Sequence, residues 1–333
     1  MTTQPETTRQ AQAALATAAA YQAEQEAERK RLLAAVLALW ATLNMKEVLP
    51  SWTIGGIGTR IYVLLSSLME LVAADADGYI RRALDEQGVT HNGPAIIPVA
   101  FSGRASDGRD LESLLAGAVA KVREAQRKGL SDARARQQGR DFLELVVNTQ
   151  IADAARAAES VAIAVADGEK NGRKVAVGWV RMLTPPSCGR CAILAGKFYR
   201  WNSGFQRHPN CDCRHIPVTV AGANELLTNP QVYFDSLTTA EQDYYFGKAN
   251  AQAIRDGADI SQVVNASKTG LSTADDGRRY RVDPKQRGDL DGTIVQNGQV
   301  LRPTVWQIYR DAKGNQEVAK AMLARFGYTR PQR

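Results

Sequence analysis

Residues 188–213 read CGRCAILAGKFYRWNSGFQRHPNCDC and contain all four cysteines of the chain. The cysteines form two close pairs, Cys-x-x-Cys and Cys-x-Cys. Zinc is usually bound by four tetrahedral sulfur or nitrogen ligands, and a Cys-x-x-Cys turn brings two thiolates to one ion. The spacing therefore predicts a structural zinc (Zn²⁺) site whose ligands are Cys188, Cys191, Cys211 and Cys213.

Two histidines offer alternative ligands for this site. A Cys-x-Cys pair strains the binding of one ion at two points, so His208 or His215 could replace one of its thiols. We rank His208 as the preferred substitute. The choice between a four-cysteine site and one that contains His208 stays open at this stage.

Other cysteine chemistries fit this pattern less well. Secreted disulfide-bonded domains are small and rich in cysteine throughout, whereas the rest of this chain has none. A thioredoxin-like redox pair would need a βαβ context, but residues 184–187, Thr-Pro-Pro-Ser, indicate a loop. A zinc deaminase would need an upstream His-x-Glu and a proline directly before Cys-x-x-Cys, and the sequence has neither.

The composition is that of an ordinary globular protein, with 333 residues, 44% hydrophobic and 23% charged. This length allows two domains with cores of their own. Residues 1–8 do not resemble a secretory signal. The longest apolar stretch, Ile61–Ala74, is interrupted by Ser66, Ser67 and Glu70 and is shorter than the roughly 20 residues of a membrane span. We therefore expect no membrane span and a reducing cytoplasm, where metal-bound thiols are stable.

The N-terminal half is predicted to be all helical. Apolar residues recur at helical spacing in four segments, which predicts helices over residues 9–45, 59–87, 111–122 and 131–165. In the first of these, the part up to Arg31 is polar or alanine on every face. That part is expected to project from the core or to pack against a partner.

The C-terminal half has a different pattern. Residues 174–183 alternate and are rich in β-branched side chains, which predicts a strand that leads into the cysteines. So few apolar residues follow that metal is expected to hold the segment together. Helices are predicted within residues 228–265, with a capping box at Thr238–Glu241, and again at 305–312 and 316–326.

These patterns predict a mainly α fold, with an α+β part. We expect a helical domain over residues 1–168, a zinc-stabilised basic strand-loop module over 169–220, and a helical C-terminal region over 221–333. Residues 270–298, rich in Gly, Asp and Arg, are predicted to form a loop or tail.

Positive charge concentrates around the cysteines. Residues 173–215 contain eight Lys or Arg against one acid, Asp212, and the whole chain has a net charge of +7. Such a surface could hold DNA phosphates or an acidic face of another protein. Alternatively, some of these arginines donate to zinc thiolates or helix carboxylates. The candidate binding residues are Arg190, Lys197, Arg200, Arg207 and Arg214.

The residues around the cysteines resemble the signature of the phage Mu F-like minor head proteins. The match comprises Trp179, Cys188-x-x-Cys191, the run Leu-Ala-Gly-Lys-Phe at 194–198 and the run His-Pro-Asn-Cys-Asp-Cys-Arg at 208–214. Members often read Cys-x-x-Cys, Leu-x-Gly-Lys and His-Pro-x-Cys-Arg-Cys after a long helical region. Asp212 departs from this pattern because it stands where arginine is usual, and Arg214 is the candidate to serve instead.

Later segments look like proteins of tailed phages of actinobacteria. They include Phe-Gly-Lys-Ala at 246–249, Asp-Gly-Ala-Asp-Ile at 256–260, Ile-Tyr-Arg at 308–310 and Phe-Gly-Tyr at 326–328. The resemblance covers residues 140–328, and it extends to the N-terminal helices only in their general character.

The resemblance implies a structural virion component that is docked on the portal, inside the capsid near the portal vertex. It implies synthesis in the host cytoplasm, followed by roles in head assembly and genome ejection. The expected partners are the portal protein, copies of the chain itself and packaged double-stranded DNA. The helical domain would then bind the portal or mediate self-association.

Two alternative functions follow from the same residues. Relatives in actinobacterial phages are often labelled capsid maturation proteases, and a serine protease needs a histidine base beside its nucleophile. Only His91, with Ser102 nearby, lies away from the cysteines. Catalytic zinc would need an open position and a general base, and the cluster has no Glu. We therefore predict no enzymatic activity. The second alternative is a zinc-containing DNA-binding protein with sequence-specific binding.

Overall fold

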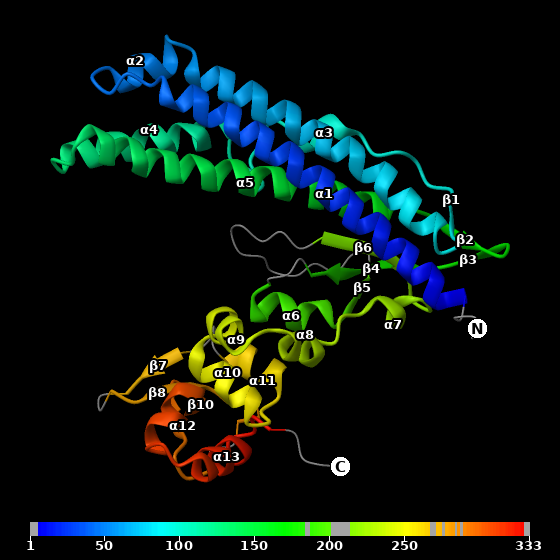
Figure 1. Cartoon of the computed structure of the whole chain (residues 1–333), viewed down its shortest axis with the longest axis vertical. Helices are drawn as coiled ribbons and strands as arrows, with labels where there is room; N and C mark the ends of the chain where they lie inside the picture. The colour runs from blue at the N-terminus through cyan, green and yellow to red at the C-terminus, as the bar shows by residue number, and fades with distance from the viewer. Residues whose placement is uncertain are drawn as a thin grey trace. The chain divides into compact units, whose positions relative to one another are not determined.

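The structure, a computed structural model, describes residues 6–183, 187–200, 214–266, 271–274, 277–283, 285–286 and 289–329. The chain forms two compact units. Unit 1 comprises Met1–Met182 and Phe198–Leu227, and unit 2 comprises Leu183–Lys197 and Thr228–Arg333. Both are mostly helical with small antiparallel sheets, which confirms the predicted mainly α class (Figure 1).

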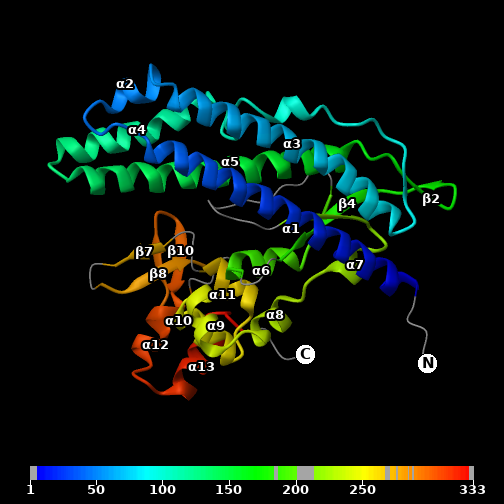
Figure 2. The same ribbon diagram turned by 45° about the horizontal axis from the view of Figure 1, so that its top comes forward.

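Four long helices dominate unit 1 and run side by side (Figure 1, Figure 2). They confirm the four predicted helices, with ends shifted by a few residues. The short helix α2 (Val48–Thr53) lies at the tip between the first two. The long helices are α1 (Glu6–Ala41), α3 (Ile57–Asp85), α4 (Leu111–Arg127) and α5 (Asp132–Ala164).

The apolar stripes predicted from the sequence form the core of this bundle. Ile61, Leu65, Leu68 and Val72 of α3 are buried, and they join buried residues of α1, α4 and α5 in one cluster. Helical spacing places these side chains on one face, and burial of their apolar surface drives the helices together. The bundle therefore needs no metal to explain its packing.

The first half of α1 packs within unit 1, so the expectation that it projects from the core is wrong. Ala11, Ala14 and Ala18 are buried, and the ring of Tyr21 stacks on that of Tyr79 in α3 with centroids 4.2 Å apart. The distance between packed helices depends on the side chains at their contact, and alanine permits a close approach. A face with a weak hydrophobic signal is therefore still a packing face.

A three-stranded antiparallel sheet of order β5-β4-β6 packs on α1, α3 and α5 in unit 1. Its strands are β4 (Val177–Met182), β5 (Phe198–Arg200) and β6 (Arg214–Thr219). The predicted strand over 174–183 is thus confirmed in β4. A second small sheet of order β1-β2-β3 consists of Thr90–His91, Gly168–Lys170 and Arg173–Lys174. The short helices η1 (Pro98–Phe101) and α7 (Ala223–Leu226) complete the unit.

Unit 2 consists of short helices and one sheet. Within residues 228–265 the predicted helices are confirmed, and Thr238 forms the predicted capping box with Glu241. The helices at the C-terminal end confirm the predictions over 305–312 and 316–326. The helices are α6 (Gly189–Ala195), α8 (Pro230–Ser236), α9 (Thr239–Phe246), α10 (Lys248–Arg255), α11 (Ile260–Ala266), α12 (Val305–Asp311) and α13 (Gln316–Arg325).

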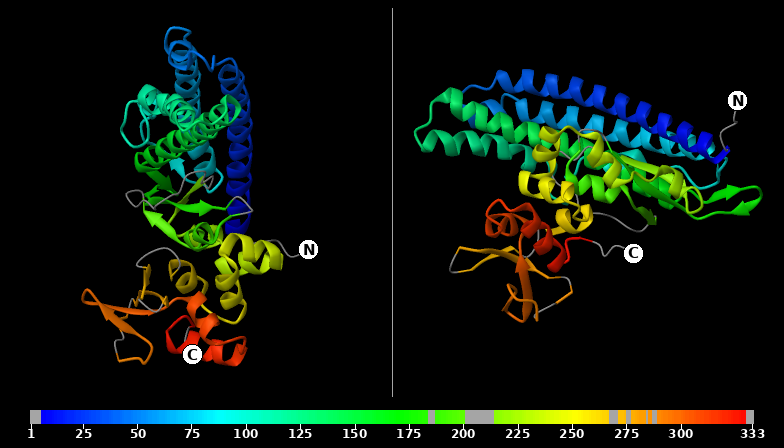
Figure 3. Two further views of the ribbon diagram at one scale, coloured as in Figure 1. Left: turned by 90° about the vertical axis from the view of Figure 1, so that its left-hand side faces the viewer. Right: turned by 60° about the horizontal axis from the view of Figure 1, so that its bottom comes forward.

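The loop or tail predicted over residues 270–298 is wrong in part, because this segment contributes three strands to an antiparallel sheet of order β7-β8-β10-β9. Figure 3 shows these orange strands beside the red helices α12 and α13. The strands are short, and β8 pairs with β10 rather than with its next neighbour along the chain, so the local pattern carried little strand signal. They are β7 (Leu271–Thr273), β8 (Arg279–Val282), β9 (Ile294–Gln296) and β10 (Gln299–Pro303).

Within the described residues, α3 is the one helix that is long and apolar enough to cross a membrane by length and composition. Its apolar stripe is buried against the other helices of the bundle. The core helix of a soluble protein passes the same test. The finding is compatible with the expected lack of a membrane span.

Gly139 of α5 marks a close approach that tests this packing. An added Cβ would lie 2.5 Å from Trp40 Cζ2 and 2.8 Å from the Ala118 carbonyl oxygen. Gly139→Ala is expected to lower the free energy of unfolding by about 1–3 kcal/mol, because overpacking forces neighbours to shift. Chemical denaturation followed by circular dichroism measures the change.

Gly78→Ala in α3 is the matched control. There an added Cβ meets only the flexible Arg82 Nη1 atom, at 3.3 Å. Alanine should be neutral at this position or stabilise by up to about 1 kcal/mol through helix propensity. Equal effects at both glycines would contradict the packing of α5 described above.

Candidate metal centre

The Cys-x-x-Cys pair lies at the N-terminal end of α6. Cys188 is the N-cap residue, with extended backbone angles of φ −69° and ψ 158°, and Cys191 lies in the first helical turn. Residues 189–195 were expected to belong to a strand-loop module, so the helix is a correction. The apolar residues Ala192–Ala195 are buried within the structure, which explains why this short segment is helical.

The two thiols have the separation that one zinc ion requires. Their Sγ atoms are 3.6 Å apart. Zn–S bonds of about 2.3 Å at a tetrahedral angle place two sulfur atoms about 3.8 Å apart, whereas a disulfide needs about 2.05 Å. The pair therefore fits the edge of a tetrahedral zinc site.

Neighbours within unit 2 hold this turn in place. Ser187 N–H donates to Tyr233 Oη at 2.6 Å, and Tyr233 O–H donates to the Ser187 carbonyl oxygen at 3.0 Å. Gly189 packs so closely that an added Cβ would lie 2.7 Å from the ring of Phe246. Cys191 is 4% exposed. The position of the α6 turn is thus fixed by contacts within unit 2.

The other predicted ligands, Cys211, Cys213 and the substitute His208, lie outside the described residues. Among the residues that the structure does describe, no group of three or more His, Cys, Asp or Glu could hold a metal ion. The four-cysteine and His208-containing sites therefore remain predictions. What the structure contributes is the geometry of the first pair.

The predicted basic residues have different environments. Lys197 and Arg200 are exposed, and Arg190 donates to Asn265 Oδ1 at 2.5 Å. Arg207 lies outside the described residues. Arg214 is only 6% exposed, so its predicted role in binding a phosphate or an acidic partner is wrong. It is buried because β6 directs it toward the helices of unit 1.

A buried charged cluster, which the sequence analysis missed, surrounds Glu159 of α5. This carboxylate is fully buried, with one oxygen 2.8 Å from His215 Nδ1 and the other 3.8 Å from Arg214 Nη1. Both basic residues begin β6, one and two residues after Cys213. We call Glu159, Arg214 and His215 the Glu159 cluster. It fixes the start of β6 to the helical bundle, at the end of the cysteine segment.

Aromatic rings enclose this cluster. Tyr79 of α3 donates its O–H to the His215 carbonyl oxygen at 2.6 Å, and the Trp179 ring meets the His215 ring edge-on, with centroids 4.1 Å apart. Burial, and then the negative charge of Glu159, raise the pKa of Tyr79 well above its usual value. Tyr79 therefore stays a neutral hydrogen-bond donor. His215, one of the two histidines offered above as alternative zinc ligands, contacts Glu159 through its Nδ1 atom.

A sequence signal for Glu159 did exist. It occupies the buried stripe of α5, among Ala155, Ala158 and Ala162 at helical spacing. An acid on such a face is rarely buried without a partner. The identity of that partner could not be read from the sequence, because Arg214 and His215 are far away along the chain.

The serine protease alternative gains no geometric support within the described residues. Ser102 Oγ donates to the Val99 carbonyl oxygen at 3.1 Å, and no hydrogen bond joins it to His91. Burial, and then the charge of Arg81, lower the pKa of His91. The two residues are close in sequence but are not arranged as a nucleophile and its base.

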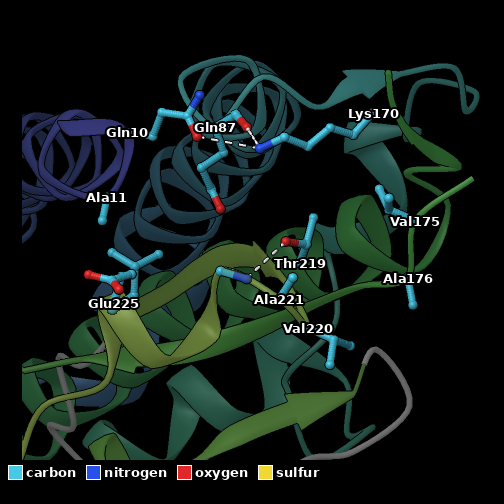
Figure 4. A pocket seen from close by; sticks show the side chains of 12 residues that line it. Gln10, Ala11, Gln87, Lys170, Val175, Ala176, Thr219, Val220, Ala221 and Glu225 are labelled. Atoms are coloured by element: carbon cyan, nitrogen blue, oxygen red, sulfur yellow. Dashed lines mark hydrogen bonds between the residues drawn. The ribbon is translucent and has the colours of Figure 1, made fainter. Parts of the chain in front are cut away.

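Unit 1 also contains a cavity of about 350 Å³, between α1, β2 and the β6–α7 connection. Figure 4 shows Lys170 reaching Gln87 and Gln10 at its rim. The Lys170 Nζ atom donates to the Gln87 carbonyl oxygen at 2.6 Å and to Gln10 Oε1 at 3.4 Å. The lysine charge thus serves contacts within the chain.

Comparison with protein-family models, curated proteins and solved structures gave no match to this chain.

The predicted zinc site can be tested through its metal content and through Cys188. Purified native protein should contain one zinc per chain by elemental mass spectrometry, and its thiols should react only after chelation. Cys188→Ser should lose the zinc and unfold the C-terminal half, because metal-binding energy is folding energy in small modules. Limited proteolysis should then digest that half and spare the helical bundle. Unchanged protease resistance would contradict the prediction.

The Glu159 cluster predicts a large stability effect. Glu159→Gln should lower the free energy of unfolding by about 3 kcal/mol or more, because it removes one charge of a buried ion pair. Glu124→Gln, at an exposed carboxylate bonded to Lys128, is the matched control and should have a far smaller effect. Thermal denaturation of both variants decides, and similar melting temperatures would exclude a structural role for the buried pair.

Proposed function

We propose that the chain is a structural minor head protein of a tailed bacteriophage. In this proposal it docks on the portal inside the capsid, contacts packaged DNA, and takes part in head assembly and genome ejection. The observation that carries the proposal is the Cys188–Cys191 pair, whose 3.6 Å sulfur separation suits a structural zinc. The same pair belongs to the motif that resembles the Mu F-like minor head proteins.

The architecture supports a structural role. Unit 1 places a long helical bundle before the cysteine segment, in the chain order expected for that family. The Glu159 cluster ties β6, which follows the cysteines, to α5 of that bundle. We propose zinc as a structural cofactor, with Cys211 and Cys213, or His208 in place of one thiol, as the remaining ligands.

The bundle tip suits a docking contact with the portal. Ile54, at the end of α2, is 90% exposed, and Leu49 on the same short helix is 45% exposed. Arg60 donates to the carbonyl oxygens of Gly55 and Gly56, which fixes the turn that presents Ile54. Ile54 and Leu49 thus leave two apolar side chains exposed at this tip, and exposed apolar surface can serve as a protein interaction site. We propose this tip as the portal-binding part of the helical domain.

DNA contact is the second part of the proposal. Lys197 and Arg200 are exposed and carry the positive charge that phosphates require. Binding by such residues is sequence-blind and weakens with salt. A sequence-specific regulator would instead discriminate between duplexes of different sequence.

Portal docking is tested with Ile54→Asp. The variant should fold normally, because the side chain is exposed, but it should no longer co-elute with the portal ring of the same phage. A charge in a desolvated apolar contact is costly. Size-exclusion chromatography with light scattering measures the complex.

Val232→Asp provides the matched control for this experiment. Val232 lies in unit 2, is 65% exposed, and is in the first turn of α8, where an acid is favourable to the helix. This variant should bind the portal as the native chain does. Separate elution of the native chain and the portal would refute the proposed function, and retained binding by Ile54→Asp would refute the tip as the docking site.

A further inference from the structure

A tryptophan and two arginines form an exposed group in unit 2 that the zinc motif does not explain. Trp306 of α12 is 40% exposed. The guanidinium carbon of Arg279 lies 4.3 Å from the centroid of its indole ring, and that of Arg310 lies 5.4 Å away. Both arginines are exposed. We call these three residues the Trp306 surface.

The local fold fixes all three positions. Thr304 caps α12 by accepting from Gln307 N–H, so Trp306 and Arg310, four residues apart, share one helix face. On the neighbouring strand β8, Arg279 donates its N–H to Gln307 Oε1 at 3.0 Å. Its carbonyl oxygen accepts from Thr304 N–H, also at 3.0 Å. The backbone of Arg279 is therefore held at both of its polar groups.

Within the described part of unit 2, the acid next to this surface is engaged by other residues. Asp311 is the adjacent acid, and its carboxylate accepts from Arg278 at 2.5 Å and from Gln307 at 2.7 Å. Among the described residues, no carboxylate lies within salt-bridge distance of Arg279 or Arg310. Two guanidinium groups thus face solvent beside one aromatic ring, with their positions restricted by it.

Another arginine of unit 2 makes a similar ring contact for a structural purpose. Arg302 stacks over Tyr328 at 4.1 Å, but it is 1% exposed and donates to the Phe326 carbonyl oxygen. Both of these contacts of the Arg302 guanidinium lie within the fold. The Trp306 surface differs because its arginines present theirs outward.

We propose that the Trp306 surface binds the phosphate backbone of double-stranded DNA. The guanidinium fork matches phosphate oxygens, and a ring-held arginine loses less freedom on binding. Two exposed guanidinium groups beside one aromatic ring favour a polyanion as the partner. The inference takes DNA as the partner from the proposed function, and it places a contact outside the cysteine region to which the sequence analysis assigned DNA binding.

The test uses the full-length, zinc-containing chain and fluorescent duplexes of two unrelated sequences, with anisotropy measured over a range of salt concentrations. The native chain should bind both duplexes equally. The double variant Arg279→Gln/Arg310→Gln should bind both duplexes more weakly. The plot of its log K against log salt should fall less steeply, with a slope whose magnitude is smaller by about two, one for each lost phosphate contact. Circular dichroism checks that the variant is folded.

Arg325→Gln is the matched control. Arg325 is also exposed and lies 5.7 Å from the ring of Phe326, but it is paired with Asp291. This variant should keep the native affinity and slope. The double variant Arg279→Lys/Arg310→Lys should keep most of the salt slope, since each lysine keeps its charge, but lose affinity, since the fork geometry is gone.

Native affinity and slope in the double glutamine variant would overturn the proposal. So would binding of the native chain to an acidic polypeptide such as polyglutamate but not to the duplexes, which would assign the surface to an acidic protein. The outcome of the portal experiment does not depend on the outcome of the DNA-binding experiment. A chain that binds DNA through Arg279 and Arg310 but ignores the portal would refute the proposed function and leave this inference standing.

Discussion

Unit 1 depends on the burial of one carboxylate. Glu159 projects from α5 into a site where water cannot solvate it, so the fold must supply basic groups and hydrogen bonds there. Arg214 and His215 meet this requirement from β6, and Tyr79 of α3 secures the His215 backbone. This buried charge thus ties the start of β6 to α5, beside the apolar contacts that pack the sheet on the bundle. It also sets where the chain emerges after the cysteine segment.

The same constraint separates structural from surface arginines. Arg214, in the basic segment around the cysteines, is paired with Glu159. In unit 2, Arg302 contacts the ring of Tyr328 and donates to a carbonyl oxygen. Arg279 and Arg310 make comparable ring contacts but remain exposed. A count of positive charges along the sequence therefore overstates one surface and misses another. Available charge depends on which guanidinium groups the fold has already used.

The metal proposal and the charge proposals rest on different evidence. The Cys188–Cys191 separation reflects the local geometry of a helix N-terminus, in which a Cys-x-x-Cys pair brings its thiols together. That geometry follows from a motif of four residues. The DNA proposal depends instead on the pairing of β8 with β10 and on the start of α12, which bring residues 279 and 306 together. The closeness of Cys188 and Cys191 could be predicted from the sequence, whereas the closeness of Arg279 and Trp306 could not.

The sequence by itself determined the features with short range. Helical periodicity predicted α3 and its buried stripe, side-chain chemistry predicted the Thr238 capping box, and cysteine spacing predicted the close approach of Cys188 and Cys191. The tertiary structure was needed to establish that alanines in α1 form a packing face, that β7, β8, β9 and β10 form a sheet, and that Arg214 is buried. The physical reason is that periodicity and capping act within a few residues, whereas desolvation and ion pairing depend on partners far away in the chain.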